Sequence, residues 1–552
     1  MGRSMTPKRS ALPDQAEPGA RTETFTVTEG TAPGEPAVRL PRTLTVSTGP
    51  AETIERTHLD TFDWRLWRAG AEMVVELGPN GRLLRWRPAA AGEVALEVEA
   101  PPRRRRDLPP GTVAREVGPR LGVRALLPAA VVRMERRCIT VTDRAGKTVA
   151  RVWWEHQTAL DPRQQDGPGR TVVRVEGLLG YEAERRAVAA ALARTPGLEL
   201  LEGAGELEWA AAARGRTPGD YTSRIDVPMT PETTAAEAMR AILAHLRGTA
   251  AANVGGTVGD LDPEFLHDLR VAVRRARSAM GQLRGAYEPD RLESLREELR
   301  WVGAITGPCR DLDVFLLDLE DWAEELGEAA GPELEPLAEL VRQEQAAAHR
   351  MLAAELRSAR FRKVLAGWRR VTARPWRVDA ASAPEAERDA LTFGAQRIQR
   401  AYRRMRKRGE GLDEATPAAV VHRLRIDGKK LRYLLEFFSA VLGAATPGLV
   451  KQLRALQDEL GAFNDLAVQQ ARLEQMARKL HEGGAAGAET LLLAGRLGAM
   501  MEARQQERRR AVEERLDEFF ARPVRREVSQ LGAGADKAGG GPSGADRTGG
   551  GG

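Results

Sequence analysis

The sequence predicts two folded domains of different class: an α+β domain, mainly antiparallel, followed by an all-α domain made of two related halves. The 552-residue chain is longer than one ordinary domain. Period-two hydrophobic alternation and turn signals dominate residues 21–226, whereas helical periodicity dominates residues 230–526. Within the helical part, two sequence motifs occur twice in the same order, which indicates a duplication.

Composition and charge are those of a folded protein. Hydrophobic residues make up 42% and charged residues 29% of the chain. The net charge of +6 is too small to indicate a partner if it is spread evenly. The two cysteines exclude a disulfide framework and a four-cysteine zinc site, and agree with a reducing cytoplasm. No run of about 18 apolar residues exists, so no membrane partner is expected.

Two hairpins and a further strand define the predicted sheet of the first domain. Residues 72–76 and 82–86 flank one turn, and residues 138–141 and 148–154 flank another. Hairpin-connected strands pair antiparallel, which gives the domain its expected architecture.

The ends of the chain differ from the rest. Residues 1–20 are polar and rich in proline, and residues 532–552 are rich in glycine. Neither segment can bury enough apolar surface to order itself, so both are expected to be disordered tails.

Cap-then-proline signals mark helix starts in the second domain. They occur at Thr230-Pro231, Asp262-Pro263 and Thr416-Pro417. Glycine-rich stretches predict the breaks between helices, the first of them at residues 248–259. Long helices joined by short loops favour an antiparallel bundle.

The helical domain contains an internal repeat. Residues 267–277 and 422–432 share the pattern H-x-L-R-x3-[RK]-[RK]-x-R, 155 residues apart. Residues 307–314 match residues 461–468, 154 residues apart. Two matches at nearly the same separation predict halves near 230–370 and 383–520.

The basic residues of each repeat form one stripe on a helix. His267, Arg270, Arg274 and Arg277 fall within a sector of roughly 80°. Comparable stripes are formed by His422, Arg425, Lys429 and Arg432, and by Arg397, Arg400, Arg404 and Lys407. Like charges at these spacings repel, so the stripes need a counter-anion. Arginine forks fit phosphate oxygens, and several stripes favour a linear polyanion.

Other interpretations of the stripes fit less well. A solvated face paired with acids from neighbouring helices is the simplest alternative, but the duplication of the pattern disfavours it. Nucleic acid is disfavoured because only Tyr402 and Tyr433 lie near the stripes for base stacking. His267 and His422 lack ligands or nucleophiles at suitable spacing, so neither metal nor catalysis is expected there. Donation to phosphate or a bridge between two helices remains for them.

These motifs resemble the CHAD domain, a helical family that binds inorganic polyphosphate. The resemblance covers about residues 230–520 and includes the continuation Leu431-Arg432-Tyr433 and the segments 310–314 and 464–468. It implies two pseudo-symmetric helical-bundle halves and a basic groove that binds polyphosphate. The hypothesis that follows is a cytoplasmic binding protein that is recruited to polyphosphate granules. The residues expected to bind polyphosphate, from the resemblance and the stripes together, are His267, Arg270, Arg274, Arg275, Arg277, Arg397, Arg400, Arg404, Lys407, His422, Arg425, Lys429, Lys430 and Arg432.

Residues 53–77 resemble a CYTH segment, part of the triphosphate-tunnel fold. The family's opening E-x-E-x-K, which supplies metal-binding carboxylates and a phosphate-binding lysine, is absent, and Glu23 is the nearest acid. The paired acids expected late in the domain are reduced to Glu176. Metal-assisted hydrolysis needs several carboxylates, so an inactive domain without a cofactor is expected. The alternative is a triphosphatase or polyphosphatase that uses Mg²⁺ or Mn²⁺.

Overall fold

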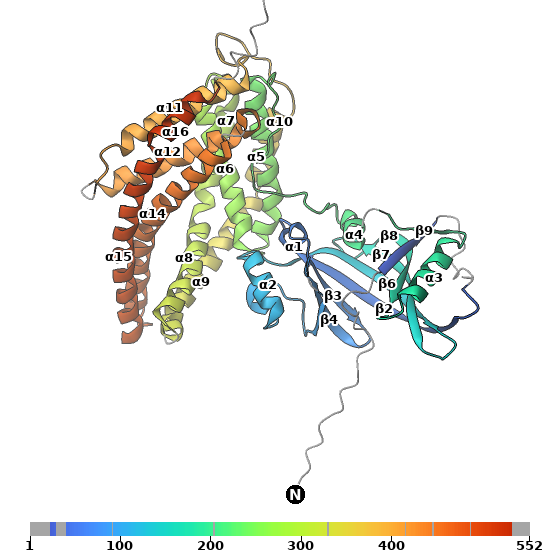
Figure 1. Ribbon diagram of the computed structural model, residues 1–552. Helices are drawn as coiled ribbons and strands as arrows, with labels where there is room; N and C mark the ends of the chain where they lie inside the picture. Colours follow the sequence, from blue (N-terminus) through green and yellow to red (C-terminus); the bar gives the residue numbers. More distant parts are fainter. Residues whose placement is uncertain are drawn as a thin grey trace, which may run out of the picture. The chain divides into compact units, whose positions relative to one another are not determined.

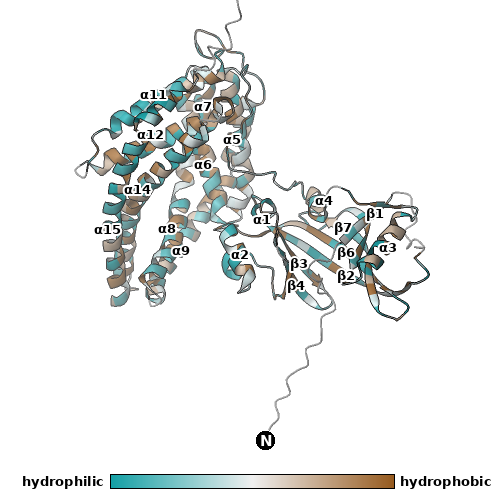
Figure 2. Cartoon of the chain, in the orientation of Figure 1, coloured by the Kyte–Doolittle hydropathy of each residue, from teal (hydrophilic) through white to brown (hydrophobic). Residues whose placement is uncertain are grey.

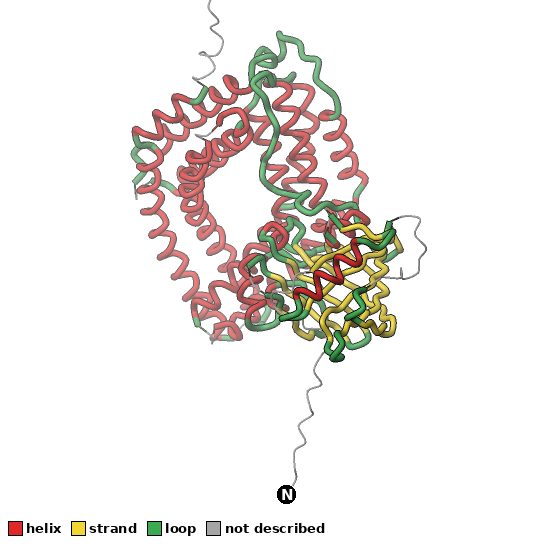
Figure 3. The backbone as a smooth tube through the Cα atoms, turned by 45° about the vertical axis from the view of Figure 1, so that its right-hand side comes forward, coloured by secondary structure: helices red, strands yellow, loops and turns green. Residues whose placement is uncertain are grey.

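The computed structural model describes residues 22–28, 40–90, 92–202, 205–327, 330–413, 416–443, 446–485 and 487–532. The predicted tail 1–20 lies outside these residues, as does all but the first residue of the tail 532–552. The chain divides into two compact units, residues 1–222 and 223–552. Figure 3 shows strands in the first unit and long helices in the second, so the predicted fold class is confirmed.

The first unit is built on a nine-stranded antiparallel sheet in the order β5-β4-β3-β2-β6-β7-β8-β1-β9. Both predicted hairpins are present, as β3–β4 and β6–β7. The strands are β1 (Thr22–Val27), β2 (Thr45–Asp60), β3 (Glu72–Gly78), β4 (Gly81–Arg87), β5 (Val94–Glu97), β6 (Leu127–Thr142), β7 (Thr148–Leu160), β8 (Asp166–Gly177) and β9 (Leu198–Leu200). The unit also contains α1 (Arg65–Arg68), η1 (Arg105–Asp107), α2 (Thr112–Leu121), α3 (Glu182–Ala193) and α4 (Glu206–Ala213).

The two faces of this sheet differ in polarity because strand residues alternate between them. On one face, Met73 and Trp86 pack against Val117 of α2, and Val175 packs against Val188 of α3. The other face carries charged side chains on β2, β3, β4, β7 and β8, described below. Helix α4 packs against β6 and β7 through Ala210 and Ala211.

The second unit is entirely helical (Figure 1). Its helices are α5 (Ala235–Val258), α6 (Pro263–Gln282), α7 (Pro289–Ile305), α8 (Gly307–Leu326), α9 (Ala330–Arg357), α10 (Ala359–Thr372), α11 (Ala390–Gly409), α12 (Ala418–Phe437), α13 (Ser439–Leu442), α14 (Thr446–Glu482), α15 (Ala488–Phe519) and α16 (Arg522–Gln530). Figure 2 shows hydrophilic and hydrophobic residues interleaved along the long helices, as expected of amphipathic helices around a core. No helix among the described residues is both long and apolar enough to span a bilayer.

Local signals located one of the three predicted helix starts. Asp262 caps α6, with Pro263 in its first turn. The start predicted at Thr230 is wrong, because α5 is capped by Thr234, whose side chain and that of Glu237 form a capping box. Helix α12 is capped by Pro417 without a side-chain hydrogen bond from Thr416.

The helix break predicted at residues 248–259 is also wrong. Helix α5 runs through this stretch to Val258. A Cβ on Gly256 would lie 2.2 Å from the ring of Phe265, so the glycine allows α5 and α6 to approach closely. Here glycine serves tertiary packing rather than chain reversal.

Candidate functional site

The two helices that carry the repeated basic motif, α6 and α12, contact each other directly. The Nε of Arg274 donates to the Tyr433 hydroxyl over 2.9 Å. Arg275 is buried and forms an ion pair of 2.8 Å with Glu436. The side-chain amide of Gln282 donates to the backbone carbonyl of Lys430. These contacts place the stripes of the two sequence halves side by side.

The larger basic cavity between these helices, called the Lys429 cavity below, has a volume of about 670 Å³. Its lining includes six basic residues, which are Arg224, Arg274, Arg275, Lys429, Arg432 and Arg454, together with His267. The acids in the lining are Asp268 and Glu436. Glu436 is shared by three guanidinium groups, those of Arg275, Arg432 and Arg454. The cavity therefore keeps an excess of positive charge.

Lys429 is half-buried in this cavity. Within the described part of the chain it has no carboxylate at ion-pair distance. Burial, together with the nearby cations Arg425, Arg274 and Arg432, lowers the pKa of Lys429 to about 7, and Asp465 opposes this shift only in part. A bound anion would supply the missing counter-charge.

A smaller basic cavity, called the Lys430 cavity below, has a volume of about 270 Å³. Six basic residues line it and no acidic one does: Arg277, Arg284, Arg397, Arg400, Arg404 and Lys430. Arg397 has an ion pair of 2.9 Å with Glu385, which reduces the excess charge by one. Burial lowers the pKa of Arg277, and the neighbouring Arg300 and Arg296 add to that effect. Such a concentration of cations on α6, α11 and α12 is stabilised by bound anions.

Two predicted site residues of α12 line neither cavity and contact the second repeated motif instead. The Nδ1 of His422 lies 2.5 Å from the Oδ1 of Asn464, and Arg425 forms an ion pair of 3.0 Å with Asp465. His422 thus bridges α12 and α14, which is one of the two roles that the sequence left open for it, the other being donation to phosphate. Since α12 and α14 are joined by these pairs, they hold the α12 stripe in position.

Arg270, Lys407 and Arg310 also lie outside the two cavity linings. Arg270 donates to the carbonyl of Gly303 and to the hydroxyl of Thr306. Lys407 is exposed on α11. Arg310, whose position the sequence left open, donates to the carbonyl of Pro263 at the start of α6.

Sequence reasoning missed Arg224, Arg454 and Glu436 as members of the Lys429 cavity. None of them belongs to a repeated motif or to a basic run. Only the packing of α14 and of the segment before α5 brings Arg454 and Arg224 to the stripes. No pattern in the sequence signals that proximity.

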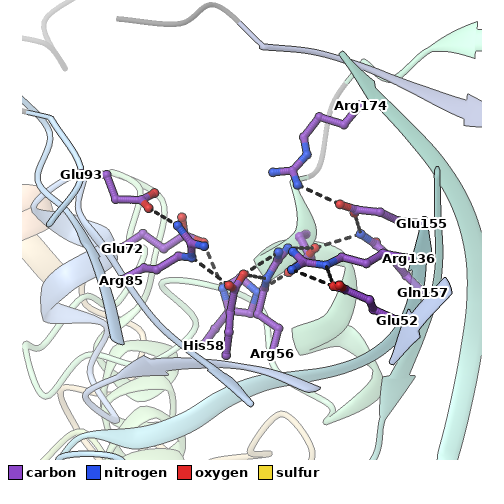
Figure 4. Close-up of polar contacts among 12 residues, drawn as sticks. Glu52, Arg56, His58, Glu72, Arg85, Glu93, Arg136, Glu155, Gln157 and Arg174 are labelled. Carbon is purple, nitrogen blue, oxygen red and sulfur yellow. Dashed lines mark hydrogen bonds and ion pairs between the residues drawn. The ribbon is translucent and has the colours of Figure 1, made fainter. Parts of the chain in front are cut away.

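In the first unit, the charged face of the sheet is an ion-pair network (Figure 4). Arg56 is held by Glu76 at 2.7 Å and by Glu206 at 2.8 Å. His58 lies 3.0 Å from Glu72 and 2.8 Å from Glu206. Burial alone would lower the pKa of His58, but these two carboxylates outweigh it and raise the pKa to about 9. His58 is therefore protonated at neutral pH.

The acids of this network do not fit a divalent metal. Burial would raise the pKa of Glu206, but Arg56 and His58 hold it well below its usual range. Glu155 pairs with Arg174, and Glu176 accepts the indole N–H of Trp153. Among the described residues, no group of three or more His, Cys, Asp or Glu could hold a metal ion. Internal cations occupy the coordination sites that Mg²⁺ or Mn²⁺ would need.

Comparison with known proteins identifies the helical region. A family model of the CHAD domain matches residues 237–474. The CHAD domain of the plant Ricinus communis is 27% identical, with 53% of this chain and 95% of that chain covered and a TM-score of 0.45. PptA from Streptomyces chartreusis is 17% identical, with 52% and 99% covered and a TM-score of 0.41.

A candidate adenylate cyclase from Bacillus halodurans is 13% identical, with 29% of this chain and 82% of that chain covered and a TM-score of 0.22. No curated protein matches the chain.

Proposed function

Since residues 237–474 form a CHAD domain, we propose that this protein binds inorganic polyphosphate through its two basic cavities. One observation carries the proposal: the Lys430 cavity is lined by six basic residues and no acidic one. Guanidinium forks donate two parallel hydrogen bonds to phosphate oxygens. A linear phosphate chain presents repeated anionic groups to such cavities and releases condensed counterions when it binds.

The lining residues favour bare phosphate over nucleic acid. Neither cavity is lined by a phenylalanine, tyrosine or tryptophan. Proteins that hold single-stranded nucleic acid commonly stack bases on such side chains, which contributes about 1–3 kcal/mol per base. Without them, the recognised feature is the repeated phosphate. Binding to long chains would recruit the protein to polyphosphate granules in the cytoplasm.

The alternative, a metal-dependent triphosphatase in the first unit, has no support in the geometry. The carboxylates that could bind metal face arginine and histidine side chains instead. We therefore propose a binding protein rather than a hydrolase.

A pair of double variants on one helix tests the proposal. Arg400→Gln with Arg404→Gln removes two cations of the Lys430 cavity, where neither makes an ion pair in the described structure. Arg403→Gln with Lys407→Gln removes two exposed cations of the same helix that line neither cavity. Both double variants change the net charge by the same amount, so they differ only in position.

Affinity for long-chain polyphosphate near physiological salt should fall about tenfold or more in the cavity variant. The slope of log affinity against log salt concentration should become shallower by the amount that corresponds to about two phosphate contacts. The surface variant should lose no more than about threefold. Equal losses in the two variants would refute binding in the cavity. A higher affinity for single-stranded DNA than for polyphosphate of equal charge would favour the nucleic-acid alternative.

A further inference from the structure

The exposed side of α10 carries a further concentration of positive charge, outside both cavities. Between residues 357 and 377 the chain has eight basic residues and no acidic one. Among the described residues, the carboxylate within ion-pair distance of this segment is that of Glu298, which pairs with Arg360. We propose that α10 binds double-stranded DNA by lying in its major groove, with contacts to the phosphates on both sides. This function is separate from polyphosphate binding, because neither cavity is lined by a residue of this segment.

Helix α10 packs against α5 and α7 and leaves about half of its circumference exposed (Figure 1). Phe361, Val364 and Trp368 are buried in the core of the helical unit. The opposite side of the helix contains only arginine, lysine, alanine and glycine. These exposed or half-exposed residues are Ala359, Arg360, Arg362, Lys363, Ala366, Gly367, Arg369 and Arg370. The whole face is therefore made of cations and of residues that do not obstruct them.

Two rows of cations flank a row of alanines on this face. At 100° per residue, Arg362 and Arg369 lie about 40–60° to one side of Ala366. Lys363 and Arg370 lie at similar angles on its other side. Within each row the cations are seven residues apart, which is about 10.5 Å along the helix. The alanines between the rows allow a partner to approach the helix closely.

The spacing of the two rows fits the major groove of DNA. Extended lysine and arginine side chains place their charge about 8 Å from the helix axis, so rows about 100° apart are about 12 Å from each other. The major groove of B-DNA is about 12 Å wide, admits an α-helix and has a phosphate backbone on either side. A single polyphosphate chain would follow one row only. A flat anionic bilayer would be matched best by cations along the middle of the face, where α10 has alanine.

The composition of the face favours contacts to phosphates over contacts to bases. It has no asparagine or glutamine, whose amides pair with adenine in the major groove. It also has no aromatic residue, but a duplex keeps its bases stacked on one another and does not need one. Phosphate contacts position a protein without reading the sequence. We therefore expect binding that is largely independent of sequence, with a dissociation constant of about 10⁻⁴–10⁻⁶ M near physiological salt.

Two quadruple variants of the full chain test this inference by fluorescence anisotropy with a labelled DNA duplex of about 20 base pairs. The α10 variant carries Arg362→Gln, Lys363→Gln, Arg369→Gln and Arg370→Gln. The control variant carries Arg403→Gln, Lys407→Gln, Arg525→Gln and Arg526→Gln. These four control residues are exposed cations of α11 and α16 and, like the α10 set, make no ion pair in the described part of the chain. Thermal unfolding verifies that both variants are folded.

The α10 variant should lose at least about tenfold in affinity for the duplex, and its slope of log affinity against log salt concentration should be shallower by about 3.6. The control variant, which loses the same charge, should change affinity by less than about threefold. Equal losses in the two folded variants would overturn the inference, because net charge rather than the face of α10 would then govern binding.

Duplex RNA of the same length tests insertion into the groove. Its A-form major groove is deep and narrow, so a helix cannot enter it as it enters B-DNA. The wild type should bind the RNA duplex at least about fivefold more weakly than the DNA duplex. Equal affinity for the two duplexes would contradict insertion of α10 into the major groove.

Polyphosphate and lipid vesicles separate this inference from its rivals. The α10 variant should keep its polyphosphate affinity within about threefold, and Arg400→Gln with Arg404→Gln should keep its DNA affinity within the same factor. Equal losses of DNA and polyphosphate affinity in the α10 variant would show a general anion surface and overturn the inference. Binding of the wild type to anionic phospholipid vesicles but not to duplex DNA would also overturn it. If DNA binding depends on α10 while polyphosphate fails to bind, this inference stands and only the proposed function falls.

Discussion

The Nε of Arg274 lies 2.9 Å from the hydroxyl oxygen of Tyr433, so a guanidinium of the first repeat donates to a side chain of the second. Tyr433 is buried, whereas Arg274 is exposed at the Lys429 cavity. The hydroxyl therefore fixes an otherwise flexible cation where two sequence halves meet. This single contact couples the duplication to the geometry of the proposed site.

Loss of that hydroxyl should weaken binding without unfolding the protein. Tyr433→Phe keeps the buried ring and removes one hydrogen bond, which costs about 1 kcal/mol of stability. Arg274 would then lose its fixed orientation, and we expect polyphosphate affinity to fall about two- to fivefold. Fluorescence titration together with thermal unfolding checks both numbers. An unchanged affinity would mean that Arg274 does not contact the chain.

Polyphosphate binding should weaken as the pH rises through neutrality. In the free protein, Lys429 has a pKa of about 7 and is mostly neutral above that pH. A bound polyanion favours the charged form of the amine and therefore raises its pKa. Binding therefore takes up a proton, and affinity should fall by up to about tenfold per pH unit above pH 7 until the pKa of the bound state is reached. Lys429→Arg, which stays charged, should flatten this dependence. A wild-type profile as flat as that of the arginine variant would contradict the role of Lys429.

The ion-pair network should make the stability of the first unit depend on pH in both the acidic and the alkaline range. Glu72 and Glu76 have pKa values lowered to about 2 by His58 and by Arg56 and Arg85, against the opposing effect of burial. Their contribution is present above about pH 4.5 and is lost as the pH falls towards 2. His58 has a pKa raised to about 9, so its contribution is present below about pH 6.5 and is lost as the pH rises through 9.

Calorimetry of the full chain can follow this second loss. The free energy of unfolding of the first unit should fall between about pH 6.5 and 9, by at most about 3 kcal/mol. His58→Gln should unfold at a lower temperature and lack the decline in this window. A decline of the same size in that variant would assign it to another group.

Divalent metal should leave the first unit unchanged. Its carboxylates are already paired with arginine and histidine, so a metal has no ligand set to stabilise. We expect no rise in melting temperature with millimolar Mg²⁺ or Mn²⁺ and no phosphate release from tripolyphosphate. Metal-dependent release that Glu176→Ala abolishes would restore the triphosphatase alternative.

Gly256 and Gly255 are neighbours in α5 with opposite expected responses to alanine. A Cβ at Gly256 would lie 2.2 Å from the Phe265 ring, whereas a Cβ at Gly255 meets nothing within 4 Å. Gly256→Ala should destabilise the helical unit by about 1–3 kcal/mol through overpacking. Gly255→Ala should stabilise it by up to about 1 kcal/mol through helix propensity. Denaturant unfolding distinguishes the two, and equal effects would refute the close approach of α5 and α6.

The sequence predicted which helices carry the site, but not which helices pack against one another to form its cavities. The repeated H-x-L-R motif located α6 and α12, because a helical stripe is a local pattern. It could not show that Lys429 and Lys430 line different cavities, since that depends on which helices pack on either side of α12. Arg454 escaped notice for the same reason.

The network of the first unit was also beyond sequence reasoning. Arg56 and His58 lie in a mainly polar stretch of β2, beside Glu55 and Thr57, a composition usually typical of a strand exposed to solvent. Both are instead buried, because Glu206 at the start of α4, about 150 residues later, covers them. Gly256 of α5 shows the same limit, since only the position of Phe265 explains it.

The most direct test is the polyphosphate affinity of the wild type and of the triple variant Arg274→Gln, Arg400→Gln, Arg404→Gln, measured over a range of salt concentrations. If polyphosphate binds in the two cavities, the logarithm of the wild-type affinity should fall linearly with the logarithm of the salt concentration. The triple variant should bind about a hundredfold more weakly, with a slope that is shallower by the equivalent of about three phosphate contacts. A triple variant that binds as tightly as the wild type, with the same slope, would contradict the account.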